Sequence, residues 1–366
     1  MIIDGHAYCF PPLDGASGFP AVNDHLRYLQ REMAEHHQPV WRLRDHAPGD
    51  NEALADPADR SLGGLKEVNF RSGGFGRFAW SVRGDEYAKQ YLPPYCQDLS
   101  HPPDLLVAQM DYVGIDRAVL HASPIMGFLN DYLADCVRRY PARLLALASV
   151  KEWEIEQDPE AAVAEVVRAY RLGLHGYQFI LDTRYRHGIT GSWDGPRLRT
   201  FWDGVVALGK PIFFTLNAWP RATVEDYLGQ LKTWRGWLER YPQAVAVHTH
   251  GFPWRLFRHG DRLHLPGTLF EPFRASSARL QLLFPISLGN IWDFPYAELR
   301  PTIVELVDTL GSDRLIYGTD MPNVERFCNY RQTLDTFRVH CRGLIPDEDI
   351  ANIIGGTAAR LFGLGA

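Results

Sequence analysis

Residues 145–181 have the sequence LALASVKEWEIEQDPEAAVAEVVRAYRLGLHGYQFIL. Two short apolar runs, at 145–150 and 174–181, flank a segment whose apolar residues recur every three or four positions. That spacing places one apolar stripe along a helix, which we expect over residues 159–172. A strand, a helix and a second strand in this order predict two parallel strands whose connecting helix covers the sheet.

The same alternation continues on both sides of this unit. Further strands are predicted at 1–4, 117–120, 211–216, 244–248, 280–286 and 314–317, with helices near 198–208, 224–241 and 299–311. The total matches the eight strands that a closed (β/α)8 barrel, or TIM barrel, requires. An open doubly wound sheet is the alternative, but no G-x-G-x-x-G pattern follows the first strand. We therefore predict an α/β fold, a TIM barrel formed by a single domain over residues 1–366.

A long insertion interrupts the barrel pattern after the first strand. Residues 11–105 are rich in proline, glycine, arginine and aromatic residues, and they are too numerous for a simple loop. We expect an ordered segment that contains a β-hairpin with strands at 66–71 and 77–82. Because loops that follow barrel strands lie at the mouth of the barrel, this insertion is predicted to cap the mouth. A weaker interpretation has one of its basic residues, such as Arg71 or Lys89, reach an anionic substrate.

The composition is that of a globular protein without a polyanionic partner. The 44 acidic and 38 basic residues are interspersed, which argues against binding to nucleic acid or to an anionic membrane. No apolar run is long enough to span a bilayer, and the N-terminus lacks the features of a signal peptide. We expect a cytoplasmic protein that acts on a small molecule, with a homodimer as an open possibility.

Titratable residues stand at the ends of four predicted strands. They are His6 after the first strand, His121 after the second, His248 and His250 after the sixth, and Asp320 after the eighth. The carboxyl ends of barrel strands converge on one mouth, so we expect these side chains to meet there. Imidazole and carboxylate groups suit a divalent ion such as zinc, manganese or iron, and they also suit acid–base catalysis without a metal.

Several segments resemble the amidohydrolase-related family. Residues 2–6, IIDGH, resemble the opening I-D-x-H-x-H of that family, and residues 110–120 resemble its M-D-x-x-G-I-D-R-x-V-L segment. Residues 310–322 resemble the G-x-D-R-L-x-F-G-S/T-D-x-P segment that ends the barrel. The order of these segments matches the family over most of the chain. The family includes lactonases, metal-dependent hydrolases and nonoxidative decarboxylases such as aminocarboxymuconate semialdehyde decarboxylase, and its fold is the TIM barrel.

The resemblance implies a metal site from which this chain lacks two ligands. Family members that bind zinc use both histidines of H-x-H, a histidine after the fifth strand and the aspartate after the eighth. Here His6 and Asp320 are present, but Tyr8 and Thr215 occupy the other two positions. Zinc normally has at least three protein ligands, so zinc or manganese would need a further one from the sixth strand. The incomplete set slightly favours a metal-free site.

The resemblance also assigns catalytic roles. His248 corresponds to the sixth-strand histidine that acts on the substrate or on water in the family, and we predict that it activates water together with Asp320. His6 and Tyr8 are predicted to complete the catalytic group, because tyrosine can donate a hydrogen bond where the missing histidine would have held an ion. Either His248 or His250 is the candidate third metal ligand.

Aromatic residues near strand ends predict a partly aromatic substrate. The residues predicted to bind it are His250, Asn217, Trp80, Trp254 and Trp292. The function predicted first is hydrolysis of a lactone or amide of a small, partly aromatic or carboxylate-bearing molecule. Nonoxidative decarboxylation of an aromatic or unsaturated acid is the second possibility. A degenerate barrel that serves as a binding protein is the third.

Overall fold

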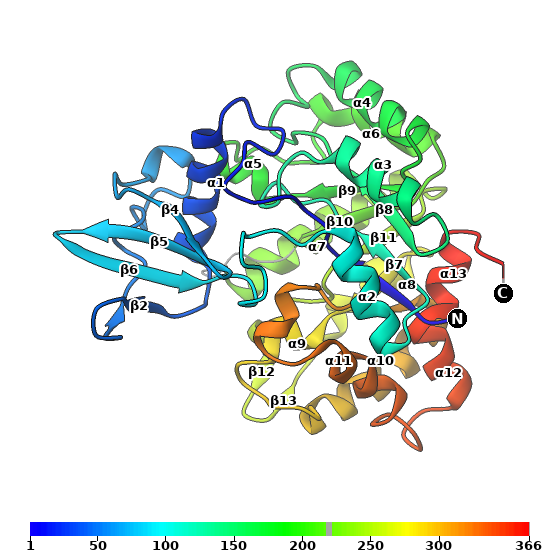
Figure 1. Cartoon of the computed structure of the whole chain (residues 1–366). Coiled ribbons are helices and arrows are strands. Elements are labelled where there is room, and N and C mark those ends of the chain that lie inside the picture. Colours follow the sequence, from blue (N-terminus) through cyan, green and yellow to red (C-terminus); the bar gives the residue numbers. More distant parts are fainter. Residues whose placement is uncertain (217–221, 366) are drawn as a thin grey trace.

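A computed structural model describes residues 1–216 and 222–365. Its central feature is an eight-stranded parallel sheet in the order β1-β7-β8-β9-β10-β11-β14-β15 (Figure 1). Beyond the last strand, Met321 forms a parallel bridge with Ala7 of β1, which brings the two edges together. The sheet is therefore a nearly closed barrel, and the predicted TIM-barrel fold is confirmed. The strands are β1 (Ile3–Ala7), β7 (Arg117–Leu120), β8 (Leu144–Ala148), β9 (Gly176–Ile180), β10 (Ile212–Thr215), β11 (Ala246–His248), β14 (Arg279–Leu282) and β15 (Leu315–Tyr317).

Helices alternate with these strands and surround the barrel (Figure 1). The predicted helices are confirmed as α4, α6, α7 and α10, with ends within two residues of those expected. The strand predicted at 280–286 ends at Leu282, because Pro285 stands in the first turn of a short helix, where a missing N–H costs nothing. The helices outside the insertion are α2 (Pro103–Val113), α3 (Asn130–Arg139), α4 (Pro159–Arg171), α5 (Asp182–Arg186), α6 (Arg199–Ala207), α7 (Val224–Arg240), α8 (Glu271–Arg274), α9 (Phe284–Leu288), α10 (Arg300–Leu310), α11 (Tyr330–Arg338), α12 (Asp347–Ala351) and α13 (Thr357–Leu361).

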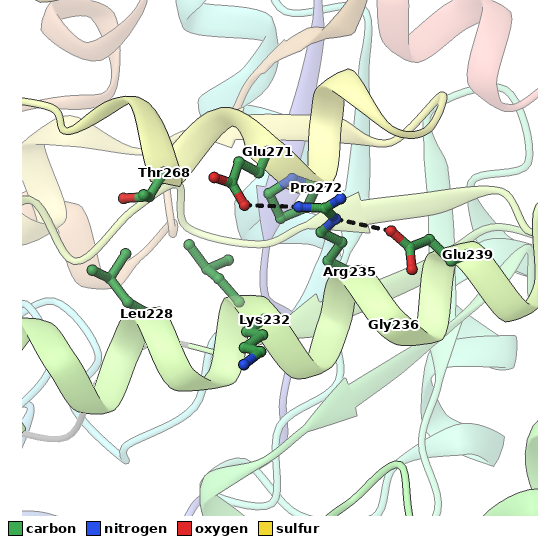
Figure 2. Close-up of a pocket in the computed structure, with 9 residues that line it drawn as sticks. Leu228, Lys232, Arg235, Gly236, Glu239, Thr268, Glu271 and Pro272 are labelled. Carbon is green, nitrogen blue, oxygen red and sulfur yellow. Dashed lines mark hydrogen bonds and ion pairs between the residues drawn. The ribbon is translucent and has the colours of Figure 1, made fainter.

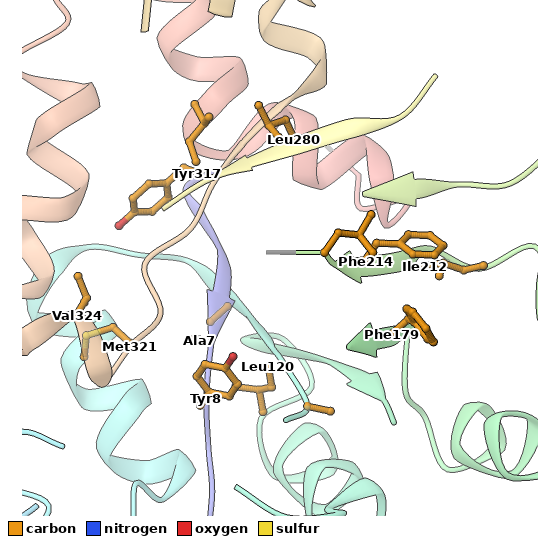
Figure 3. Packing of buried hydrophobic residues seen from close by; sticks show 14 of the residues in the cluster. Ala7, Tyr8, Leu120, Phe179, Ile212, Phe214, Leu280, Tyr317, Met321 and Val324 are labelled. Atoms are coloured by element: carbon orange, nitrogen blue, oxygen red, sulfur yellow. The ribbon is translucent and has the colours of Figure 1, made fainter. Parts of the chain in front are cut away.

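The apolar core has two parts, one inside the barrel and one around it. Phe213 belongs to an interior cluster with Val247 and Ile316, and residues of α13 pack against that cluster. Its neighbours in β10, Ile212 and Phe214, belong to the large outer cluster between the strands and the helices (Figure 3). Side chains that alternate along a strand account for this division. The interior cluster fills one end of the barrel, so polar groups have room only at the other end.

The insertion forms its own small sheet. A helix, α1 (Val22–Glu35), precedes a five-stranded antiparallel sheet in the order β3-β2-β6-β5-β4, which projects from the barrel in Figure 1. Its strands are β2 (Val40–Arg42), β3 (Pro48–Gly49), β4 (Arg71–Gly74), β5 (Arg77–Val82) and β6 (Asp85–Gln90). The single-domain boundaries and the capping role of residues 11–105 stay predictions.

The predicted hairpin exists, but its first strand was placed wrongly. The sequence predicted strands at 66–71 and 77–82, and β5 agrees, whereas β4 begins only at Arg71 and includes residues assigned to the turn. The turn itself is Phe75-Gly76, and both residues have positive φ angles, of 51° and 76°. A two-residue turn of this kind matches the twist of the flanking strands, which allows the glycine-rich residues to pair.

Among the described residues, no helix has the length and apolar character needed to cross a bilayer. The remaining short strands, β12 (Arg258–His259) and β13 (Arg262–Leu263), form a separate antiparallel pair between β11 and β14 in the sequence.

Candidate active site at the barrel mouth

His6 faces the mouth of the barrel because β1 is irregular. The register of β1 against β7 shifts between Asp4 and Ala7, and such a bulge turns a side chain away from simple alternation. Gly5 fits closely here, since a Cβ atom at this position would lie 2.5 Å from the side chain of Ile316. His6 is fully buried, and its ring stacks on that of His121 at a centroid distance of 3.5 Å.

Two residues with left-handed backbone geometry bring further polar groups to His6. His250 has a φ angle of 65° and Asp320 has one of 72°, which is uncommon for residues other than glycine and is typical of functional sites. The His250 ring lies 4.6 Å from the His6 ring, between centroids. Asp320 Oδ1 lies 3.8 Å from His6 Nε2. One nitrogen or oxygen atom from each of the three residues lies within 4.8 Å of the others.

Gln281 of β14 fixes the protonation state of His6. Its Nε2 donates a hydrogen bond of 2.7 Å to the carbonyl oxygen of Gly5, so its Oε1 faces His6 Nδ1 at 3.0 Å. His6 must therefore carry its proton on Nδ1. The lone pair on His6 Nε2 points to the Tyr8 hydroxyl, which donates to it over 2.9 Å. His6 thus presents an unprotonated nitrogen toward Asp320 and Tyr8.

Burial controls the charge of these groups. It raises the pKa of Asp320 to about 7, although the nearby Arg326 opposes this rise, and it raises the pKa of Tyr8 well above its usual value. It also lowers the pKa of His250 to about 4 and that of His6 well below its usual value. The site at neutral pH therefore combines neutral imidazoles with a carboxyl group close to its titration midpoint.

Asp4 anchors the loop that carries Asp320. Asp4 is fully buried and accepts hydrogen bonds from Thr319 Oγ1 at 2.6 Å and from the Tyr330 hydroxyl at 2.8 Å. The backbone N–H of Asp320 in turn donates to the carbonyl oxygen of His6 over 2.8 Å. These contacts hold Asp320 against β1 in a fixed position.

His248 does not join this group, contrary to the sequence prediction. Val247 belongs to the barrel interior, so the next side chain along β11 points outward. The His248 ring packs against Trp234 of α7, and its Nε2 lies 2.9 Å from the Tyr227 hydroxyl on the same helix. The structure thus places His250, rather than His248, beside His6 and Asp320.

The predicted aromatic contacts are also corrected. Trp80 of β5 is fully buried, and its ring is roughly parallel to the neighbouring rings of Phe70 and Tyr87. Trp254 is fully buried against Phe284. Neither ring has a face left for a substrate.

Trp292 does not enter the group, and the structure does not describe Asn217. Trp292 is buried, and it makes no ring contact with His6 or His250 in the described part of the chain. Asn217 lies outside the described residues.

The residues present fit a divalent metal ion. His6 and His250 provide imidazole nitrogens and Asp320 provides a carboxylate, and this donor set suits zinc, manganese and iron. His6 Nε2 carries no proton and lies 3.8 Å from Asp320 Oδ1. Of the two candidates for a third ligand, the structure places His250 beside His6 and Asp320. Thr215, at the position of a missing family histidine, instead accepts a hydrogen bond from Gln178 at 3.3 Å.

Two residues that lie near His6 and Asp320 escaped the sequence reasoning. Gln281 is a buried polar residue between apolar residues of β14, and this break in the pattern is a signal that could have been used. Arg326 lies in a short turn, η7 (Asn323–Arg326), after Asp320, and nothing in the local sequence distinguishes it from a surface arginine.

A hollow of about 470 Å³ on the outside of the barrel does not belong to this site. It lies between α7 and the segment around α8, and Arg235 bridges it through ion pairs with Glu239 and Glu271 (Figure 2). These are exposed ion pairs of the kind found on ordinary surfaces.

Comparisons with known proteins agree with this architecture. A family model described as amidohydrolase matches residues 3–364. An uncharacterised TIM-barrel protein from Bordetella bronchiseptica is 14% identical, with a TM-score of 0.55 over 99% of this chain and 98% of that one. A putative 2-pyrone-4,6-dicarboxylic acid hydrolase from Pseudomonas putida is 18% identical (TM-score 0.54, 74% and 91% covered). A 5-carboxyvanillate decarboxylase from Sphingomonas paucimobilis is 20% identical (TM-score 0.52, 73% and 84% covered). At these identities the similarity establishes the fold.

Proposed function

Since the chain belongs to the amidohydrolase family, we propose that it hydrolyses a lactone or amide of a small, carboxylate-bearing and partly aromatic molecule. The observation that carries this proposal is the meeting of His6, His250 and Asp320 at the barrel mouth, with the Tyr8 hydroxyl on His6. A base, neutral imidazoles and a hydroxyl donor at one site are the groups that acyl hydrolysis needs.

In the proposed reaction Asp320 acts as the general base. Its carboxylate takes a proton from water while the water oxygen attacks the carbonyl carbon of the substrate. The bond from that carbon to the lactone oxygen or amide nitrogen then breaks, and the protonated Asp320 returns the proton to the leaving atom. The hydrogen bonds that fix the Asp320 loop to Asp4 and to the backbone of His6 would keep this carboxylate in place through both proton transfers.

The other residues of the site would orient the substrate and stabilise the charge that develops on its carbonyl oxygen. The ring nitrogens of His250 have no recorded hydrogen-bond partner among the described residues, so we propose that this ring meets the substrate carbonyl. When His6 Nε2 binds an ion, the Tyr8 hydroxyl would be released from His6 and would donate its one hydrogen bond to the oxygen that becomes negative. His6, His250 and Asp320 would together hold a divalent ion such as zinc or manganese, which when bound polarises a carbonyl and acidifies water.

Turnover in water enriched in ¹⁸O tests the reaction class. For a lactone or amide that the enzyme accepts as substrate, we expect the product to be heavier by one molecule of water. Mass spectrometry should find one heavy oxygen in the new carboxylate. If the protein instead releases carbon dioxide from aromatic or unsaturated acids and does not act on lactones or amides, the proposed hydrolysis is wrong and the protein is a nonoxidative decarboxylase.

A further inference from the structure

We infer that Arg326, supported by His36 of the insertion, is the anion-binding residue that holds a carboxylate of the substrate. This inference rests on the proposed function, because it assigns a substrate class to the same mouth. It places the recognition of charge on the loop after β15, six residues after the proposed base Asp320.

The surroundings of Arg326 leave its charge without a balancing partner. The side chain is half-buried, and no ion pair joins it to a carboxylate among the described residues. Its Nε atom is buried without a hydrogen-bond acceptor in the same part of the chain. Arg326 and Asp320 are close enough for each charge to affect the pKa of the other group, yet they do not form an ion pair. A cation that is partly removed from water gains from an anionic partner, and here a ligand would supply it.

Other buried arginines of the chain differ from Arg326, because each forms an ion pair with a carboxylate. Arg184 is fully buried and pairs with Glu156 at 2.5 Å. Arg31 is buried and pairs with Glu35 at the same distance. The Nε atoms of Arg31 and Arg184 also lack an acceptor, so the contrast lies in the carboxylate. Both of these side chains have an internal one, whereas Arg326 has none within ion-pairing distance among the described residues.

Residues of the insertion hold the Arg326 side chain in position. Its Nη1 donates to the carbonyl oxygen of Tyr91 at 2.5 Å and lies 3.3 Å from His36 Nε2. The guanidinium group also lies over the ring of Tyr91, 5.4 Å from its centroid. A guanidinium group that is oriented in this way keeps other donors for a planar carboxylate.

Lys89, a residue that the sequence offered as an anion contact, instead supports this arrangement. Its Nζ is fully buried and donates to the carbonyl oxygens of Met33 and His36, at the end of α1, and to Asn51. Arg71 pairs with Glu86 on the exposed surface of the small sheet. Lys89 therefore fixes the end of α1 next to His36, while Arg326 is a basic residue close to Asp320.

Benzoate and benzamide provide the test, because they share a ring and differ in charge. We expect benzoate to bind the wild-type protein in calorimetric titrations, and we expect Arg326→Met to weaken this binding by about tenfold or more, as the loss of a charged hydrogen bond implies. Arg326→Lys should give partial binding, since it keeps the charge but loses the planar fork. Benzamide should show no difference between the proteins.

Arg331→Met is the matched control. Arg331 stands on the exposed side of α11 and donates to the carbonyl oxygen of Tyr112, so the variant has the same net charge as Arg326→Met. Benzoate that binds all variants equally, or that does not bind the wild type, would overturn the inference. Binding requires no turnover, so a protein that binds benzoate through Arg326 but hydrolyses nothing would refute only the proposed function.

Discussion

Asp320→Asn is expected to lower kcat/KM by about a thousandfold, within the range that general bases contribute. Asparagine keeps the shape of the side chain and can still contact Asn323, which lies 3.4 Å from Asp320 Oδ1. It cannot take a proton from water, so the variant should fold normally and lose catalysis. Initial rates on any lactone or amide that the wild type hydrolyses, together with a thermal melt, would measure both effects.

Asp4→Asn is the matched control for this variant. Asp4 is also a buried carboxyl group, and burial raises its pKa to about 6, but it accepts hydrogen bonds from Thr319, Tyr330 and the backbone N–H of His6 and so supports the site without contacting the reacting water. We expect a lower melting temperature and a loss of kcat smaller than that of Asp320→Asn, because Asp4 positions the Asp320 loop but takes no proton itself. An Asp320→Asn enzyme as active as Asp4→Asn would refute the assignment of the base.

Arg186→Met is expected to destabilise the chain by roughly 3–5 kcal/mol, the usual cost of leaving buried charges unpaired. Arg186 of α5 pairs with Glu32 at 2.9 Å and Glu35 at 2.8 Å, both on α1 of the insertion, and with Asp182 at 2.7 Å. Methionine fills a similar volume but leaves these three carboxylates without their common partner. Denaturant unfolding at neutral pH would measure the loss.

Arg168→Met is the comparison for Arg186→Met. Arg168 also pairs with more than one carboxylate, at 2.8 Å with Asp131 and at 2.7 Å with Glu165, but it lies on the surface, where solvent screens the charges. Its loss should cost less than about 1 kcal/mol. If the two variants lower the free energy of unfolding by the same amount, the buried ion pairs of Arg186 do not attach the insertion to the barrel more strongly than a surface pair would.

The barrel could be predicted from the sequence because its signals are local. Apolar runs and helical spacing depend only on neighbouring residues, and β7 and α7 begin and end within one residue of their predicted bounds. The hairpin failed at β4 because the tight turn at Phe75 and Gly76 depends on backbone geometry that the glycine-rich sequence allows at several positions. Tertiary pairing decided between these positions.

The site could be predicted only in part, because strand ends do not show which way a side chain turns. His6 and Asp320 meet as expected, but the choice between His248 and His250 depended on which residues of β11 face inward. The positive φ of His250 turns its ring toward His6, and no residue pattern signals this conformation for histidine. Arg326 was missed for a different reason, because its contacts come from an insertion that is distant in the sequence.

The central claim is that His250, and not His248, completes the site with His6 and Asp320. The most direct test is kcat/KM for His250→Asn and His248→Asn, measured side by side on one substrate. We predict a loss of about a hundredfold or more for His250→Asn, and a change of less than about tenfold per folded molecule for His248→Asn. His248→Asn should instead lose stability, because the Tyr227 hydroxyl loses its buried partner. Full activity in His250→Asn, with the large loss in His248→Asn, would contradict the claim.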